Sequence, residues 1–355
     1  MLFFSNLFIF LWVFVIIDYI IKLMKIFSLL ERVFRMICNN VLEAIGNTPL
    51  IRLNRMADPE GAQVLVKFEG LNVGGSIKTR TALNMIEDAE RKGLIDKEKT
   101  IIVEPTSGNQ GIGLALIGAV RGYKTKIIMP DSVSEERRKL VNHYGAEVIL
   151  IHDAGDIGAC IDECLQTALR MAAEDKNVFV PQQFENKANP LVHKNHTALE
   201  IIEQAGCQID GFCSGIGTGG TITGIGEVLK EKYPDITIWA VEPENAAILS
   251  GGSIGTHLQM GIGDGVIPPI LNRQIYEDIC IITDEEAIRT SKELARLEGL
   301  MCGISSGTNV AAALKMAKKL GKGKTVVTIL PDTAERYFST PLFENDSLNK
   351  KHGIL

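Results

Sequence analysis

Short apolar runs alternate with longer amphipathic runs between residue 64 and residue 330. Short apolar runs bounded by turn residues predict buried strands, whereas longer runs with apolar positions three and four residues apart predict helices. The predicted strands span residues 64–69, 100–104, 126–129, 147–151, 178–181, 211–214, 236–242, 279–283 and 325–330. The predicted helices span residues 82–92, 111–120, 135–144, 159–174, 196–205, 221–232, 285–298 and 309–320. This alternation is typical of an α/β protein in which helices cover both faces of parallel sheets.

Two blocks of this alternation predict two domains, with parallel-rich twisted sheets flanked by helices and a cleft between the domains. The length of 355 residues agrees with a two-domain protein. We assign residues 39–80 and 185–343 to a large domain, residues 81–184 to a smaller mobile domain, and residues 344–355 to a tail. In the large domain, a short helix from Val41 and a turn at residues 46–49 come before a first strand.

Residues 1–38 form a hydrophobic segment whose composition differs from that of the rest of the chain. Residues 2–21 are almost wholly apolar and long enough to span a membrane, and the basic residues that follow would lie on the cytoplasmic side. Alternatively, the gene model is too long, because Met24 and Met36 are possible starts and the globular pattern begins only near Asn39. We favour the second interpretation, because nothing later in the chain needs a membrane, and we expect a cytoplasmic protein.

Charge and cysteine content exclude several classes of protein. The formal net charge is −6 with 23% charged residues, so the chain carries no basic surface for nucleic acid. The seven cysteines are odd in number, and no two have the CxxC spacing of a zinc or redox site. We therefore expect reduced thiols, no metal site and no nucleic-acid partner.

A lysine stands just after two glycines, where a predicted strand gives way to a predicted helix: Gly74-Gly75-Ser76-Ile77-Lys78. A lysine at such a junction can bind a phosphate, or it can act as an amine nucleophile that forms a Schiff base. A solvated lysine beside a turn is the third interpretation, because short motifs are often matched by chance. The pattern around Lys78 leaves all three open.

A glycine-rich turn at residues 215–221 joins another predicted strand to a helix. Glycines let backbone N–H groups converge, and the N-terminus of the following helix favours an anion. Thr218 and Thr221 can add hydroxyl donors. No lysine follows in the Walker pattern, so a single phosphate monoester fits this turn better than a nucleoside triphosphate.

Two further loops carry polar side chains in front of predicted helices. The loop at residues 105–111 contains Thr106, Ser107 and Asn109, whose hydroxyls and amide suit a carboxylate, although serine and asparagine also cap ordinary helices. In the loop at residues 302–307, Ser305 or Ser306 can cap the next helix or meet a ring nitrogen.

In chain order, these loops resemble the motifs of the cysteine synthase family, the β-replacement branch of pyridoxal-phosphate enzymes. The matching stretches are IGNTPL, GGSIKTR, PTSGNQGI, PQQFENKANP, GTGGT, GIGDGVIP and GISSGTN, spread over roughly residues 39–343. The resemblance implies a tryptophan-synthase-β-like fold, with pyridoxal 5′-phosphate bound by the large domain in the interdomain cleft. It also implies a homodimer.

The same resemblance implies a role for individual residues. Lys78 would be the Schiff-base lysine and later the base that takes the substrate α-proton, Asn109 would bond the ring oxygen of the cofactor, and Ser305 would face the pyridine nitrogen. The residues that would cradle the phosphate are Gly217, Thr218, Gly219, Gly220 and Thr221. Those that would hold the substrate carboxylate are Thr106, Ser107 and Gln183.

The chain departs from the family pattern at residues 73–75, at Thr79, at Gln110 and most sharply at Asp264. Relatives that make cysteine usually have a small residue at the last position, and those like cystathionine β-synthase have tyrosine. A thiol with a pKa near about 8.5 is partly ionised at neutral pH. Water, with a pKa of about 15.7, needs a base. Asp264 therefore favours water as nucleophile, or protonation of a departing thiolate, unless it only caps an Asp-Gly turn.

These features predict a pyridoxal-phosphate lyase or transferase that acts on L-cysteine. The products would be hydrogen sulfide together with L-serine when water is the nucleophile, or lanthionine when a second cysteine is. The alternative is a cysteine synthase that makes L-cysteine from O-acetyl-L-serine and sulfide, which shares the early chemical steps. A protein that keeps the fold without turnover, as a scaffold, is a third possibility.

Overall fold

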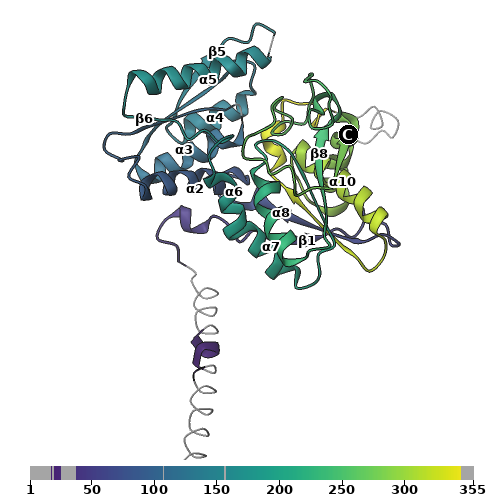
Figure 1. The fold of residues 1–355 in the computed structure, drawn as a ribbon. Helices are drawn as coiled ribbons and strands as arrows, with labels where there is room; N and C mark the ends of the chain where they lie inside the picture. Colours follow the sequence, from purple (N-terminus) through teal and green to yellow (C-terminus); the bar gives the residue numbers. More distant parts are fainter. Residues whose placement is uncertain (1–16, 18–19, 25–36, 107, 156, 345–355) are drawn as a thin grey trace, which may run out of the picture. The chain divides into compact units, whose positions relative to one another are not determined.

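The computed structural model describes residues 17, 20–24, 37–106, 108–155 and 157–344 (Figure 1). The chain divides into two units, residues 1–44 and residues 45–355. In the first unit the 3₁₀ helix η1 (Val41–Ala44) is preceded by Asn39, whose side-chain amide donates to Glu43 over 2.8 Å. Among the described residues, no helix is long and apolar enough to cross a membrane. Most of the hydrophobic segment 1–38, and with it both interpretations of that segment, lies outside the described residues.

Two sheets form the framework of the second unit. The six-stranded sheet has the order β1-β2-β10-β7-β8-β9, and the four-stranded sheet has the order β5-β4-β3-β6. The strands of the larger sheet are β1 (Leu50–Arg52), β2 (Gln63–Phe68), β10 (Thr325–Leu330), β7 (Gly211–Gly215), β8 (Thr237–Pro243) and β9 (Asp278–Ile282). Those of the smaller sheet are β5 (Glu147–Ile151), β4 (Lys124–Pro130), β3 (Ile101–Pro105) and β6 (Val178–Phe179). Among these strands only β1 runs antiparallel to its neighbour, β2.

Helices of the second unit lie against both sheets (Figure 1). The helices are α2 (Lys78–Arg91), α3 (Asn109–Arg121), α4 (Glu135–His143), α5 (Ile157–Glu174), α6 (Ala188–Val192), α7 (Ala198–Ala205), α8 (Gly220–Lys232), α9 (Asp284–Glu293) and α10 (Ile304–Leu320). Short 3₁₀ segments are η2 (Glu69–Leu71), η4 (Glu244–Ala246) and η6 (Ala334–Tyr337), and π-helical turns are η3 (His193–Thr197) and η5 (Leu294–Glu298). Helices α3 and α5 contact the smaller sheet, and α8 and α10 contact the larger one.

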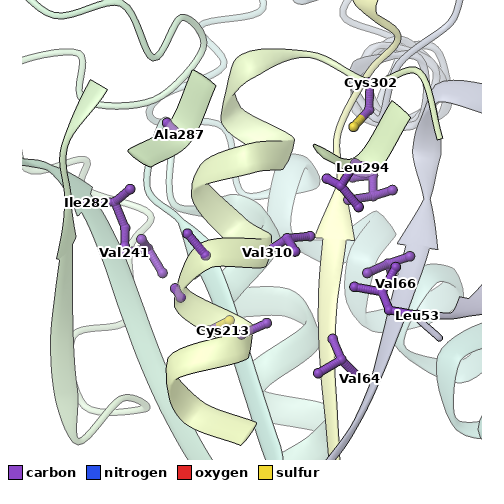
Figure 2. Close-up of a cluster of buried hydrophobic side chains, with 14 of the residues drawn as sticks. Leu53, Val64, Val66, Cys213, Val241, Ile282, Ala287, Leu294, Cys302 and Val310 are labelled. Atoms are coloured by element: carbon purple, nitrogen blue, oxygen red, sulfur yellow. The ribbon is translucent and has the colours of Figure 1, made fainter. Parts of the chain in front are cut away.

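The larger sheet is buried on both faces, which explains why its strands read as nearly continuous apolar runs. Alternate side chains of β2 point to opposite sides: Val64 and Val66 pack with α10, whereas Leu65 packs with α8. Figure 2 shows Val310 of α10 among side chains of the neighbouring strands and loops. Because each face holds its own apolar cluster, the carboxyl ends of the strands are held in fixed positions relative to the helices that follow them.

The predicted α/β class with parallel-rich sheets is confirmed, and every predicted strand and helix has a counterpart in the structure. Several boundaries differ from the prediction, and the starts of four helices differ for identifiable reasons. The helices predicted from residues 82, 111 and 309 begin earlier, at Lys78, Asn109 and Ile304, because their first turns consist of polar and small residues without apolar periodicity. The helix predicted from residue 196 is preceded by α6 and the π-helical turn η3, where Pro190 sits in the first turn and does not break the helix.

Candidate active site

A cavity of about 1070 Å³ lies where β3, β4, β7 and β10 end. In sheets with parallel strands, ligand sites form outside the carboxyl ends of the strands. The cavity wall includes the predicted site residues Lys78, Thr106, Asn109, Gln183, Gly217, Thr218, Gly219, Thr221, Asp264 and Ser305. Gly220 is not among the described lining residues, and Ser107 lies outside the described residues. Loops far apart in the chain thus come together in one place.

Lys78 is the first residue of α2 and is half-buried. Burial lowers the pKa of its ammonium group, and the nearby carboxylate of Asp264 opposes that change. Helix α3 approaches closely here, since a Cβ on Gly113 would lie 3.0 Å from the carbonyl oxygen of Lys78. A lysine whose pKa is lowered by burial is more often a neutral amine, which is its nucleophilic form.

Asp264 is half-buried in the cavity wall rather than at a solvent-facing turn. Burial raises the pKa of its carboxyl group, and the nearby side chains of Lys78 and His257 counteract that rise. Its Oδ2 lies 3.4 Å from the position that a Cβ on Gly217 would occupy. Asp264 therefore stands beside the glycine-rich turn and within electrostatic reach of Lys78.

His257 holds the loop that carries Asp264. The backbone N–H of Gln259 donates to Nδ1 of His257 over 3.1 Å, so Nδ1 is an acceptor. Nε2 lies 3.1 Å from the carbonyl oxygen of Gly263, so it must carry the proton and donate. This pattern fixes the Nε2–H tautomer and anchors the residue next to Asp264.

The glycine-rich turn forms the start of α8, where a helix N-terminus offers N–H groups to an anion. The turn is tightly packed against neighbouring loops. A Cβ on Gly217 would lie 2.5 Å from the carbonyl oxygen of Gly261, and one on Gly219 would lie 2.8 Å from Cβ of Leu271. The packing of neighbouring loops against the turn therefore requires glycine at these two positions.

Asn109, the first residue of α3, has both ends of its amide fixed. Its Nδ2 donates to Oδ2 of Asp332 over 2.6 Å, and its Oδ1 accepts from Nε of Arg336 over 2.9 Å. Tyr337 donates its hydroxyl to the same Asp332 oxygen over 2.6 Å. One N–H of Asn109 is thus left for another acceptor in the cavity.

Arg336 contacts the backbone at Gly74 and Gly75, in the stretch where the sequence departs from the family pattern. Its guanidinium donates to the carbonyl oxygens of Gly74 and Gly75, the second over 2.9 Å. A Cβ on Gly75, which has a φ of 70°, would lie 2.6 Å from Nη2 of Arg336. The other departures form local contacts: Thr79 donates to the carbonyl of Val73 over 2.7 Å, and Oε1 of Gln110 lies 2.8 Å from the Thr81 hydroxyl.

Ser305 is buried in the first turn of α10 and lines the cavity. Of the two alternatives for Ser305 and Ser306, helix capping does not apply, because the N-cap is Gly303. Thr106 follows β3, and its hydroxyl oxygen accepts from the N–H of Gly108 over 3.3 Å. Ser305 and Thr106 both line the cavity.

Gln183 lies on a turn held by a buried carboxylate. Oε1 of Glu104 accepts from the N–H of Gln183 over 3.0 Å, and Oε2 accepts from the N–H of Gln182 over 2.9 Å. Burial raises the pKa of Glu104 to about 7, although these two N–H groups act in the opposite direction. Gln182 has a φ of 55°, a backbone conformation that non-glycine residues seldom adopt.

The residues present fit pyridoxal 5′-phosphate. The start of α8 suits the phosphate because its turn exposes Thr218 and Thr221 to the cavity, and Lys78 supplies an amine with a lowered pKa. Asn109 has one amide N–H unused, and Ser305 adds a hydroxyl. Each functional group of the cofactor thus has a side chain of suitable chemistry in one cavity.

Sequence reasoning missed Glu104, Asn189, His257, Asp332 and Arg336. Asp332 and Glu104 had a visible signal, because each is an acidic residue at the carboxyl end of an apolar strand. Asn189 stands within the quoted stretch PQQFENKANP but was given no role. For His257 and Arg336 the sequence carries no comparable signal, because their hydrogen-bond partners are brought to them only by the fold.

Three comparisons with known proteins identify the family of the chain. The profile of the family described as pyridoxal-phosphate dependent enzyme matches residues 41–332. A cysteine synthase of Staphylococcus aureus is 48% identical over 312 residues, covering 87% of this chain and 98% of that protein. A hydrogen sulfide-producing enzyme of Fusobacterium nucleatum has a TM-score of 0.79 and 43% identity, covering 85% of this chain and all of that one.

A second solved structure is an aspartate-to-asparagine variant of a hydrogen sulfide-producing enzyme, in complex with an α-aminoacrylate intermediate. It has a TM-score of 0.79 and 36% identity, covering 86% of this chain and 91% of that one. The family profile and the Staphylococcus aureus relative both extend over most of the chain. The chain therefore belongs to the pyridoxal-phosphate-dependent enzymes and, among them, to the cysteine synthase family.

Proposed function

We propose that this enzyme degrades L-cysteine to hydrogen sulfide, forming L-serine with water as nucleophile or lanthionine with a second cysteine. The observation that carries the proposal is Asp264, a half-buried carboxylate in the cavity wall within electrostatic reach of Lys78. A base near the reacting carbon is needed for water and is not needed for sulfide. The two relatives described as hydrogen sulfide-producing enzymes support this direction.

The bound cofactor would supply the electron sink that loosens the bonds at the substrate α-carbon. Lys78, with its lowered pKa, would take the α-proton and later return it. Asp264, with its raised pKa, would donate a proton to the departing sulfur and take one from the incoming water. L-cysteine and water are thereby converted to L-serine and hydrogen sulfide, with every atom accounted for.

Binding of the amino acid would use Gln183 and Thr106, which line the cavity beside Asn109. The amide of Asn109 would be aimed by Asp332 and Arg336, so that its free N–H meets the ring oxygen of the cofactor. Ser305 would face the pyridine nitrogen, where a neutral hydroxyl leaves the ring a weaker electron sink than a carboxylate would. This weaker sink suits loss of a β-substituent better than transamination.

The test compares wild type with Asp264→Asn, using Asp235→Asn on an exposed loop as the matched control. We expect the wild type to release sulfide from L-cysteine and Asp264→Asn to release it about 10²- to 10⁴-fold more slowly. Cysteine formation from O-acetyl-L-serine and sulfide should persist in the variant. The proposal is wrong if the wild type releases no sulfide, or if asparagine leaves the rate unchanged.

The second candidate is a cysteine synthase acting on O-acetyl-L-serine and sulfide. The Staphylococcus aureus relative, a cysteine synthase at 48% identity, favours it. Product analysis with each substrate pair separates the two directions. If cysteine synthesis is more than about tenfold faster than sulfide release at saturating substrate, this second function is the main one.

We also propose a homodimer in the cytoplasm, in which residues 81–184 move as a smaller domain against residues 39–80 and 185–343. The support for the smaller domain is its own sheet, whose strands all fall between Ile101 and Phe179. Light scattering of the purified protein would measure the oligomeric state. Fractionation of untagged protein would measure its location.

A further inference from the structure

We propose that Asn189 is a positioning residue that joins the substrate-binding turn at Gln183 to the glycine-rich turn at Thr218. Asn189 is the second residue of α6, and only 1% of it is exposed. The inference rests on the proposed function in one respect: Gln183 is taken to bind the substrate carboxylate and Thr218 the cofactor phosphate. Asn189 itself lines neither site.

Both N–H bonds of the Asn189 amide are used, one toward each turn. Nδ2 donates to the carbonyl oxygen of Gln183 over 2.8 Å and to Oγ1 of Thr218 over 3.0 Å. Because a primary amide has two N–H protons, this arrangement leaves neither of them free. The two turns are therefore connected through a single buried nitrogen.

On the cofactor side, these bonds set the direction of the Thr218 hydroxyl. Its oxygen accepts from Asn189 and is approached by the N–H of Gly220 at 3.5 Å. The hydroxyl proton must then point elsewhere, and Thr218 lines the cavity. A threonine whose oxygen is already an acceptor is prepared to donate to a phosphate oxygen.

Asn189 also explains why residue 220 is a glycine, which contact with a phosphate would not explain. A Cβ on Gly220 would overlap Oδ1 of Asn189, and Gly220 is not among the described residues that line the cavity. Oδ1 is buried and has no hydrogen-bond partner among the described residues. The site thus accepts an unpaired carbonyl oxygen, which usually destabilises a fold, in order to keep both donors of Asn189 in place.

On the substrate side, the same amide holds a turn that is also held from the opposite side. The N–H groups of Gln182 and Gln183 donate to Glu104, and the carbonyl of Gln183 accepts from Asn189. Gln182 has a φ of 55°, so the turn needs such support to persist. A change at either turn reaches the other through Asn189, which predicts reciprocal coupling between phosphate binding and substrate binding.

The first experiment titrates the cofactor-free protein with pyridoxal 5′-phosphate and, separately, with pyridoxal, following the visible absorbance of the lysine-bound form. We expect Asn189→Ala to weaken binding of pyridoxal 5′-phosphate about tenfold, because two buried hydrogen bonds are lost. Binding of pyridoxal, which has no phosphate, should change less than about twofold. Equal losses for both ligands would contradict the proposal.

The matched control is Asn84→Ala. Asn84 also holds α6, donating to the carbonyl of Ala188 over 2.6 Å, but it touches neither turn. We expect its pyridoxal 5′-phosphate affinity to stay within about twofold of wild type. If Asn84→Ala weakens phosphate binding as much as Asn189→Ala, Asn189 only supports the helix and the proposal is wrong.

A double-mutant cycle keeps the test decisive if Asn189→Ala folds poorly. Thr218→Val removes the hydroxyl that accepts from Asn189. Asn189→Asp keeps the shape of the side chain but replaces the N–H donors with a carboxylate oxygen. In the Thr218→Val background, changing Asn189 should weaken phosphate binding by no more than about twofold further. Fully additive losses would overturn the proposed link.

The Michaelis constant separates this inference from the proposed function. Asn189→Ala should raise KM for the amino acid several-fold with a smaller change in kcat, measured with L-cysteine and with O-acetyl-L-serine. If only O-acetyl-L-serine is turned over, the proposed function fails while the link through Asn189 is still tested. An unchanged KM with both substrates contradicts the substrate half of the inference.

Discussion

Lys78 and Arg80 lie two residues apart in the first turn of α2, yet their surroundings are opposite. Lys78 faces the cavity, and burial lowers the pKa of its ammonium group. Arg80 is buried on the other side of the turn, where Nε donates to Glu69 over 2.7 Å and Nη1 donates to Glu200 over 2.7 Å. One turn of helix thus carries a destabilised charge and a fully paired one.

Arg80 belongs to a network of paired charges, and this distinguishes it from Lys78 and Asp264 at the cavity. Although burial works against the charged forms, Glu69 and Glu200 raise the pKa of Arg80, and Arg80 and Lys67 lower the pKa of Glu200 to about 2. At the cavity, burial is the largest cause: it lowers the pKa of Lys78 and raises that of Asp264, so that each neutral form is favoured. Strongly perturbed groups in a cavity are candidates for chemistry, whereas paired buried charges are structural.

The largest effect should follow from Lys78→Ala. We expect turnover to fall by roughly 10³-fold or more, because loss of a general acid–base group alone costs about 10²- to 10⁴-fold. The free energy of unfolding should stay equal or rise by up to about 1 kcal/mol, because a desolvated charge is removed. Steady-state kinetics measures turnover, and urea unfolding of the cofactor-free protein measures stability. A large loss of stability would mean that Lys78, like Arg80, is a structural charge.

Arg80→Met should have the converse effect on stability. Removing the guanidinium leaves Glu69 buried and uncompensated, and breaking a buried pair costs about 3–5 kcal/mol. Urea unfolding of the cofactor-free protein measures the change.

The control for Arg80→Met is Lys92→Ala at the end of the same helix, where an exposed lysine pairs with Asp88 over 2.6 Å. We expect that variant to lose less than about 0.5 kcal/mol. Similar losses for the two variants would remove the distinction between paired buried charge and surface charge.

Glu104→Gln should change the dependence of stability on pH. Burial raises the pKa of Glu104 from 4.5 to about 7, so the native protein keeps a proton that the unfolded chain has lost between these values. Wild-type stability relative to the variant should therefore fall as pH rises through this window, by up to about 3 kcal/mol, and stay low above about pH 7. Unfolding of both proteins at several pH values measures this difference, and a flat difference would contradict the raised pKa.

The strands were predictable because their apolar runs are bounded by turn residues, and two of them, β5 and β10, have the predicted limits. The site loops were predictable as motifs, but the side chains behind them were not. Asn189, Glu104 and Arg336 act by contacting backbone groups of other loops, and those contacts exist only once the chain has folded. The helix that begins at Ile304 was predicted to begin only at residue 309, because the glycine and serines of its first turn show no apolar periodicity.

The pairing of β2 with β10 has a consequence for synthesis of the chain. These neighbouring strands come from opposite ends of the second unit, and Gln63 and Thr325 at their starts are 262 residues apart in sequence. The four strands of the smaller sheet, by contrast, are all translated between Ile101 and Phe179. Because a ribosome adds residues in order, the smaller sheet is complete about 150 residues before β10 emerges to fill the centre of the larger one. During that interval β2 exposes an unpaired apolar edge, which is when the nascent chain most needs a chaperone.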